Sequence, residues 1–130
     1  MTLSVLLDSQ IIYAVIQDAT DQLSPKIRNF LRDGDLSATV SVTSLWELTI
    51  KWRTGKLGLL FSPEMLPGII RSFGFTLLPI TEIHVIAEIV PELEHRDPFD
   101  RLLLGICAVE GMRLLTVDKA LVNHPLAWRA

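Results

Sequence analysis

Four short apolar segments, rich in β-branched residues, recur along the chain and predict four strands. They are Ser4–Asp8, Ala38–Val42, Thr76–Ile80 and Arg113–Val117. Their first residues are separated by 34, 38 and 37 positions (4 to 38, 38 to 76, and 76 to 113). Because a strand–helix–strand unit occupies about 30 residues, each interval has room for one or two helices. Apolar strands separated by helical stretches are typical of a parallel sheet covered on both faces.

Residues that begin and end helices occupy the intervals. We expect a helix from Ser24-Pro25 to Asp33-Gly34-Asp35 and a second one from Thr43 or Ser44 to about Arg53, with Gly55 as its stop. Two more are expected from Ser62-Pro63-Glu64 to near Gly74 and from Thr81-Glu82 to before Pro91. The last is expected from Asp97-Pro98 to Gly111. Pro79 has no backbone N–H for a ladder, which predicts that the third strand lies at an edge of the sheet.

Composition indicates one ordinary globular domain over residues 1–130, with 49% hydrophobic and 21% charged residues. The lone cysteine, Cys107, excludes a disulfide framework and a thiolate metal cluster, and its apolar surroundings predict a small buried residue. No signal peptide and no apolar run of about 20 residues is present, so we expect a soluble, cytoplasmic protein without a membrane segment. With a net charge of −3, nucleic-acid binding requires a local basic patch.

Acidic residues stand where a parallel α/β sheet places its ligand site. Right-handed crossovers bring the carboxyl ends of all strands to one edge. Asp8 and Asp118 end the first and fourth strands, Glu47 follows the second, and Asp100 is the third residue of a buried helix. Each has an ordinary alternative: the aspartates cap helices well, as Asp97 before Pro98 is expected to do, and Glu47 could face solvent.

If these acids converge, the cluster must take up protons or hold a cation. Each pair of like charges about 4 Å apart costs about 4 kcal/mol at an effective dielectric constant near 20. Helix dipoles return only about 0.3–1 kcal/mol each. Four carboxylates without cysteine or paired histidines favour a hard divalent ion, Mg²⁺ or Mn²⁺. Such an ion beside an open cleft favours hydrolysis of phosphodiester bonds.

Four blocks, in this order along nearly the whole chain, carry a resemblance to a known family. They are Leu6–Ser9, then Ser41–Leu48 with Lys51 and Gly55–Leu57, then His95–Leu102, and finally Leu114–Asp118. The chain resembles PIN-domain ribonucleases, and within them the VapC-like toxins of bacterial toxin–antitoxin pairs. The resemblance implies a three-layer α/β/α fold around a parallel sheet of order 3-2-1-4, with four strands or with a short fifth near Leu126–Trp128.

The resemblance also implies an activity and partners. It implies a Mg²⁺-dependent endoribonuclease, with Mn²⁺ as a substitute, that cuts structured RNA such as tRNA or rRNA. The family's acids match Asp8, Glu47, Asp100 and Asp118, with Asp97 as a frequent companion. Homodimers and silencing by a cognate antitoxin are implied too. One departure is that close relatives often have Asp-Thr-His at the first acid, where this chain has Asp8-Ser9-Gln10.

Several other side chains are candidates for supporting roles. Ser9 can orient Asp8, and Thr116 shares a strand face with Asp118. His95 is the histidine beside the acids and a candidate for proton transfer, whereas we expect His84 and His124 to be structural or solvated. The candidates for phosphate contacts are Lys51, Arg53, Lys56, His95, Arg96 and Arg101. For Trp46, Trp52 and Trp128 we expect positions in the core or in an interface.

Three alternatives stay open. A haloacid-dehalogenase-like phosphatase needs Asp-x-Asp at the first strand, and Gln10 takes the second place. A receiver-like signalling domain fits Asp8 and Lys119 loosely, but the third strand ends without a phosphoacceptor aspartate. A degenerate PIN domain that only binds RNA is disfavoured because all four acids are present.

Overall fold

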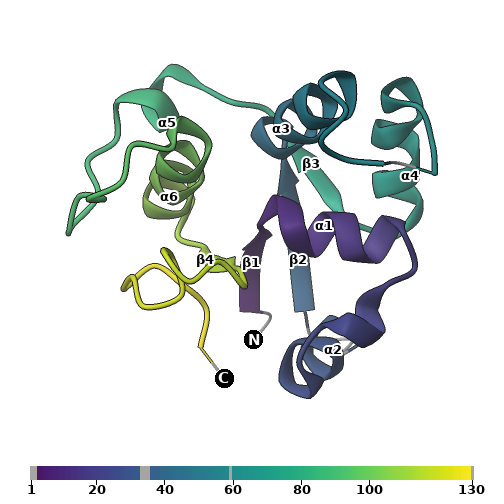
Figure 1. Cartoon of the computed structure of the whole chain (residues 1–130). Helices are drawn as coiled ribbons and strands as arrows, with labels where there is room; N and C mark the ends of the chain where they lie inside the picture. The colour runs from purple at the N-terminus through teal and green to yellow at the C-terminus, as the bar shows by residue number, and fades with distance from the viewer. Residues whose placement is uncertain (1–2, 33–35, 59, 130) are drawn as a thin grey trace.

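The fold is a four-stranded, wholly parallel sheet flanked by helices, as the sequence predicts (Figure 1). The computed structural model describes residues 3–32, 36–58 and 60–129. The strands are β1 (Leu3–Leu7), β2 (Leu36–Ser41), β3 (Thr76–Leu78) and β4 (Arg113–Leu115), in the order β3-β2-β1-β4. Pro79 directly follows β3, which is an edge strand, in agreement with the prediction from its missing N–H.

The helices are α1 (Ser9–Ile16), α2 (Pro25–Arg32), α3 (Val42–Arg53), α4 (Leu66–Ser72), α5 (Glu82–Ile86) and α6 (Pro98–Glu110), with 3₁₀ turns η1 (Thr20–Gln22) and η2 (Pro63–Met65). The expected ends of α6 are confirmed, because Asp97 caps its start and Gly111, with φ of 69°, ends it. The expected end of α2 at Asp33-Gly34-Asp35 lies outside the described residues.

Two helix predictions were wrong at their ends. The cap of α3 is Ser41, not Thr43 or Ser44, because the Ser41 hydroxyl accepts the Thr43 N–H at 3.0 Å and β2 ends there. Helix α5 stops at Ile86 and does not continue to Pro91. Ala87 is extended with ψ of 139°, and its carbonyl, for which Pro91 has no N–H to donate, accepts a hydrogen bond from Arg101.

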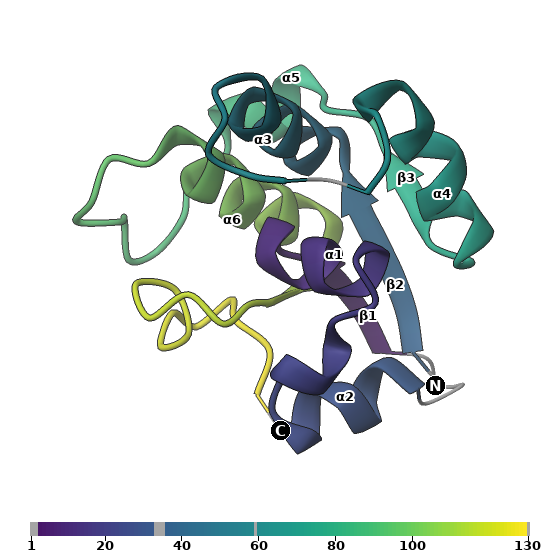
Figure 2. The ribbon, with the colours of Figure 1, turned by 45° about the vertical axis from the view of Figure 1, so that its right-hand side comes forward.

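Alternating side chains of the strands build two cores, one on each face of the sheet. On β1, Val5 and Leu7 pack into a cluster with α1, α2 and α4, whereas Leu6 packs into a second cluster with α6. Figures 1 and 2 show α1, α2 and α4 on one side of the sheet and α5 and α6 on the other. This arrangement is the expected three-layer one, and it leaves the carboxyl edge of the sheet between α1, α3 and α6.

The C-terminal segment lies beside β4 but does not form the fifth strand. Leu114 makes one parallel bridge to Ala127, with hydrogen bonds of 2.8 Å to Leu126 and Trp128 on either side. Pro125, two residues before the bridge, has no N–H to extend such a ladder. The four-strand form of the prediction therefore holds.

Burial confirms some side-chain predictions and corrects others. Cys107 is 1% exposed, and burial raises the pKa of its thiol to about 12, which is the expected behaviour of a structural cysteine. Trp46 and Trp52 are 57% and 40% exposed, so a core position was wrong for both. Trp46 instead packs edge-on against Phe99 of α6, with ring centres 5.1 Å apart.

Among residues 3–32, 36–58 and 60–129, no helix combines the length and apolarity needed to span a bilayer.

Candidate active site

Asp8 lies at the carboxyl end of β1, where β1 and β4 are joined. Its backbone N–H donates to the Leu115 carbonyl at 2.9 Å, which ties the end of the central strand β1 to that of the edge strand β4. Its side chain caps α1, since Oδ1 accepts the Ser9 N–H at 2.7 Å. Asp8 therefore caps a helix and also lies at the edge predicted for the ligand site.

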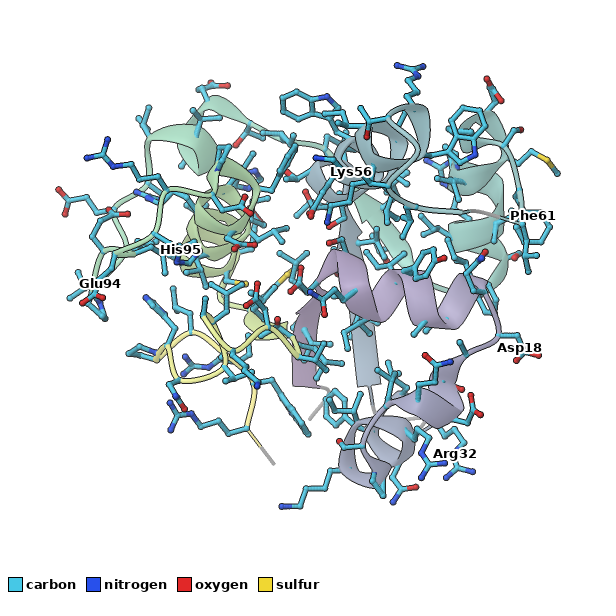
Figure 3. All side chains as sticks on the ribbon, viewed as in Figure 1. Asp18, Arg32, Lys56, Phe61, Glu94 and His95 are labelled. Atoms are coloured by element: carbon cyan, nitrogen blue, oxygen red, sulfur yellow. The ribbon has the colours of Figure 1, made fainter. Side chains whose placement is uncertain are left out.

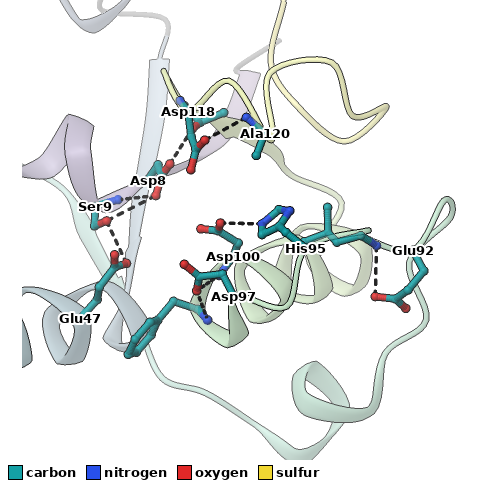
Figure 4. Close-up of polar contacts among 12 residues, drawn as sticks. Asp8, Ser9, Glu47, Glu92, His95, Asp97, Asp100, Asp118 and Ala120 are labelled. Carbon is teal, nitrogen blue, oxygen red and sulfur yellow. Dashed lines mark hydrogen bonds and ion pairs between the residues drawn. The ribbon is translucent and has the colours of Figure 1, made fainter.

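Two hydroxyl groups hold the acids around Asp8 (Figure 4). Thr116, just beyond β4, donates its hydroxyl hydrogen to Asp8 Oδ2 and accepts the Asp118 N–H at 3.0 Å. Ser9 Oγ lies 2.9 Å from Glu47 Oε1 and 3.5 Å from Asp8 Oδ1, so Glu47 receives its stronger hydrogen bond. β4 ends at Leu115 and not at Val117 as predicted, so Asp118 does not end the strand but lies three residues beyond it, where its N–H is bound by Thr116.

Glu47 enters the site from α3 and is 7% exposed. The Lys51 ammonium, one helical turn later, lies 2.8 Å from Glu47 Oε2. This pair supplies the partner that a carboxylate flanked by apolar residues requires. Burial lowers the pKa of Lys51, but the hydrogen bond to Glu47 and the charges of Glu47, Asp97 and Asp8 outweigh it and raise that pKa overall.

Asp100 enters from the first turn of α6 and is 6% exposed. Its Oδ2 lies 2.9 Å from His95 Nε2. Asp97 caps the same helix, with Oδ1 accepting the N–H groups of Phe99 and Asp100 at 2.9 and 3.3 Å. The helix start therefore presents Asp100 to the site and holds Asp97 in the capping role that the sequence predicts.

Figure 4 shows the side chains of Asp8, Asp100 and Asp118 turned toward a common space, with Glu47 and Asp97 beside it. Asp118 is half-buried, and its Oδ1 accepts the Ala120 N–H at 2.9 Å. The predicted acids are thus brought together from β1, α3, α6 and the end of β4. We call this set of Asp8, Glu47, Asp100 and Asp118 the acidic cluster.

Burial and mutual repulsion disfavour the charged forms of two members. Burial raises the pKa of Asp8, and the charges of Glu47 and Asp118 add to it, although hydrogen bonds from Thr116 and Ser9 oppose the change. Burial also raises the pKa of Asp100 from 3.8 to about 6. His95 opposes that rise, whereas Asp97, Asp8 and Asp118 add to it. The cluster therefore has a stronger demand for positive charge than Lys51 and His95 supply.

The donor type and charge of the acidic cluster suit a hard divalent cation, since its side chains offer carboxylate oxygens alone. Their present positions do not form a complete coordination sphere. Within the described parts of the chain, no three His, Cys, Asp or Glu side chains are grouped so that they could hold an ion. Glu47 is bound to Lys51 and Asp100 to His95. Binding an ion through three of these acids therefore requires rotation of their side chains.

The candidates for phosphate contacts lie on both sides of this edge. Figure 3 shows Lys56 on the segment after α3 and His95 on the segment before α6. Arg101 is engaged elsewhere, because its guanidinium lies 2.6 Å from a Glu92 carboxylate oxygen and donates to the Ala87 carbonyl. Arg96 is exposed beside His95. Of the set, Lys51 and His95 contact the acidic cluster directly, Lys51 through Glu47 and His95 through Asp100.

Sequence reasoning missed two pairings and one groove. The Glu47–Lys51 pair follows from i,i+4 spacing on a helix and could have been found. The His95–Asp100 pair depends on the backbone path before α6 and has no such signal. A groove of about 300 Å³ runs along α1, lined by residues that include Ser9, Gln10, Tyr13, Leu48 and Lys51, and it shares two residues with the surroundings of the cluster.

The other two histidines, His84 and His124, are structural, which is one of the two roles that we expect for them from the sequence. His84 is buried, with Nδ1 accepting the Thr81 N–H at 3.1 Å and Nε2 lying 2.8 Å from Glu110. His124 is buried with Nε2 lying 2.8 Å from the Pro91 carbonyl.

Comparison of the chain with models of protein families and with curated proteins found no match.

Proposed function

We propose that this protein is a Mg²⁺-dependent endoribonuclease of the VapC-like PIN type. The observation that supports the proposal best is the acidic cluster: four carboxylates from four separate segments share the carboxyl edge of a parallel sheet, where α/β proteins bind ligands. Two of them, Asp8 and Asp100, have raised pKa values, which is typical of sites that act on a charged group or bind one. The resemblance of the four sequence blocks to PIN-domain ribonucleases is a second support for the proposal.

The proposed reaction adds water to a phosphodiester phosphorus and releases a ribose hydroxyl. Mg²⁺ would supply positive charge that offsets the charge developing on the phosphate and would lower the pKa of the attacking water. Asp8, Asp100, Asp118 and Glu47 are its proposed ligands. Thr116 and Ser9 keep the Asp8 and Glu47 oxygens directed toward the site.

Proton transfer and substrate positioning are assigned to side chains at the rim. His95 Nε2 is bonded to Asp100 and is the proposed donor of a proton to the leaving oxygen. Lys51 and Arg96 are proposed to contact phosphates, because neither the net charge of −3 nor the acidic cluster itself attracts RNA. Arg101 can join them only if it leaves Glu92.

The biological role that we propose follows from the resemblance. In a toxin–antitoxin module the chain would be the toxin, acting in the cytoplasm on structured RNA such as tRNA or rRNA. It would act as a homodimer, and a cognate antitoxin with a basic tail would cover the acidic cluster. The sheet order opposes the receiver-like alternative, since receiver domains place β1 between β2 and β3, whereas β1 here lies between β2 and β4.

The test is cleavage of total RNA by the purified full chain with Mg²⁺, with Mn²⁺ and with a chelator. We expect discrete fragments with either metal and none with the chelator. Asp8→Asn and Asp118→Asn should each lower cleavage by at least about a hundredfold, since each removes a charged ligand. Asp21→Asn, on exposed η1, is the matched control and should cleave as the unaltered protein does. Equal cleavage by all variants would reject the proposal.

A further inference from the structure

The groove along α1 has the shape and chemistry of a small-molecule site. Its volume of about 300 Å³ lies at the lower end of the range for ligand pockets. Tyr13, Leu23, Leu48 and Leu57 give it apolar and aromatic walls. The groove reaches the active site, because its lining includes Ser9, which binds Glu47, and Lys51, which pairs with Glu47.

One wall of the groove is fixed before any ligand arrives. The Tyr13 hydroxyl donates to the Gly58 carbonyl at 2.6 Å, so the ring is held against the segment after α3. Gln17 holds the same segment through two contacts, to the Gly58 carbonyl at 3.4 Å and from the Leu60 N–H at 3.0 Å. A preformed aromatic wall costs little ordering entropy when a planar ligand packs against it.

Two of the polar groups of the groove are neutral amides with free hydrogen-bonding capacity. Gln10 and Gln22 line it and are exposed, and among the hydrogen bonds of the described residues none uses either side-chain amide. Lys51 is the one charged side chain among the lining residues, and it lies where the groove meets the acidic cluster, 2.8 Å from Glu47. The other lining residues, with amides and an aromatic ring, suit a heterocyclic base and leave the neighbouring phosphate to Lys51.

We propose that the α1 groove binds one nucleobase of the RNA, next to the phosphodiester that is cut, and that Gln10 and Gln22 determine which base is preferred. The inference rests on the proposed function, because it needs the phosphate to lie at the acidic cluster. Each glutamine amide offers a donor and an acceptor on one edge, which is the pattern that reads the edge of a base. Tyr13 and the leucines provide the stacking surface.

The first experiment measures base preference at the cut. The full chain with Mg²⁺ is given a library of structured RNA hairpins with randomised loop positions, and the fragment ends are sequenced. We expect a preferred base at one position beside the cut, and a fall of about fivefold or more in that preference for Gln10→Ala or Gln22→Ala. Asn29→Ala, an exposed amide on α2 outside the groove, should keep the preference. Thermal unfolding confirms that each variant is folded.

The outcomes separate this inference from the proposed function. Mg²⁺-dependent cleavage with no base preference, or with the same preference in both glutamine variants, would overturn the groove assignment and leave the nuclease proposal standing. Absence of cleavage would reject the nuclease proposal. In that case NMR of the ¹⁵N-labelled chain, with chelator and nucleoside 5′-monophosphates, tests the groove alone. Shifts at the Gln10, Tyr13 and Leu23 amides that ribose 5-phosphate does not cause support a base site, and equal shifts with both overturn it.

Discussion

Thr116 and Asp8, 108 residues apart in the sequence, are joined by a hydrogen bond from the Thr116 hydroxyl to Asp8 Oδ2. Both side chains are buried, Asp8 directly after the central strand β1 and Thr116 directly after its neighbour, the edge strand β4. The bond keeps one oxygen of a buried carboxylate satisfied, and it fixes the direction in which Asp8 faces the acidic cluster. Thr116 also accepts the Asp118 N–H, so it positions two of the four acids.

The first prediction is that Thr116→Val destabilises the protein by about 1.5–3 kcal/mol, because the buried Asp8 carboxylate loses a donor. Thr116→Ser should recover most of the loss, since it keeps the hydroxyl. Urea unfolding measures the change in the free energy of unfolding. Thr76→Val, at an exposed threonine on β3, is the control and should change it by less than about 0.5 kcal/mol. Equal effects at the two threonines would show that the Thr116–Asp8 bond does not carry this role.

Much of this edge could be predicted from the sequence, because strand ends in a parallel sheet are set by topology. Asp8 and Asp118 follow apolar segments, so right-handed connections predict that both lie at the same edge of the sheet. The strand order that makes β1 and β4 neighbours was implied by the family resemblance, and the structure has that order. Asp97 and Gly111 carry local signals for the two ends of α6, and both are confirmed. Pro79 likewise marks the edge strand through its missing N–H. Each of these signals depends on one or two neighbouring residues.

The details that could not be predicted depend on side-chain packing across the chain. Pro91 predicts that α5 ends before it, because it lacks the N–H that a helix would bond to the Ala87 carbonyl. The end at Ile86, and the pairing of that carbonyl with Arg101 fourteen residues away, carry no such signal. Trp46 is exposed although its neighbours are apolar, because α3 turns that side chain toward Phe99 and the surface. Arg101 was expected at a phosphate and is instead paired with Glu92. Such pairings follow from the final geometry and not from spacing.

The second prediction concerns pH. Asp100 has its pKa raised from 3.8 to about 6 in the folded state, so the folded state binds the proton more tightly than the unfolded state. The stability that this tighter proton binding adds to the folded state is fully present below about pH 3.8 and is lost as the pH rises through about 6. In chelator, Asp100→Asn should therefore be more stable than the unaltered chain at pH 7, by at most about 3 kcal/mol. The difference should shrink toward pH 4.

Urea unfolding of both proteins between pH 4 and pH 7.5 checks this prediction. Asp21→Asn is the control, because Asp21 is exposed on η1 and away from the cluster. A gap between Asp100→Asn and the unaltered chain that stays constant over this range would show that Asp100 does not titrate as described.

The third prediction concerns the close packing of α5 on α6 at Gly105. A Cβ there would lie 2.8 Å from the His84 carbonyl oxygen, which belongs to the backbone and cannot move aside. We expect Gly105→Ala to destabilise the protein by about 1–3 kcal/mol. Gly68→Ala in α4 is the matched control, since no heavy atom lies within 4 Å of its Cβ, and it should be neutral or gain up to about 1 kcal/mol. A stabilising Gly105→Ala would contradict the packing described for these helices.

The fourth prediction is that Mg²⁺ stabilises the folded chain, independently of any RNA. A ligand that binds only the folded state at a hundred times its dissociation constant adds about 2.7 kcal/mol. The unaltered protein should gain several degrees in its unfolding temperature, because the ion offsets the burial and the repulsion that raise the pKa of Asp8 and Asp100. Asp8→Asn and Asp100→Asn should lose most of that gain, whereas Asp21→Asn should keep it. Differential scanning calorimetry at constant ionic strength measures the shifts. Equal gains in all four proteins would mean that Mg²⁺ binds elsewhere, and the acidic cluster would then lose its assignment as a metal site.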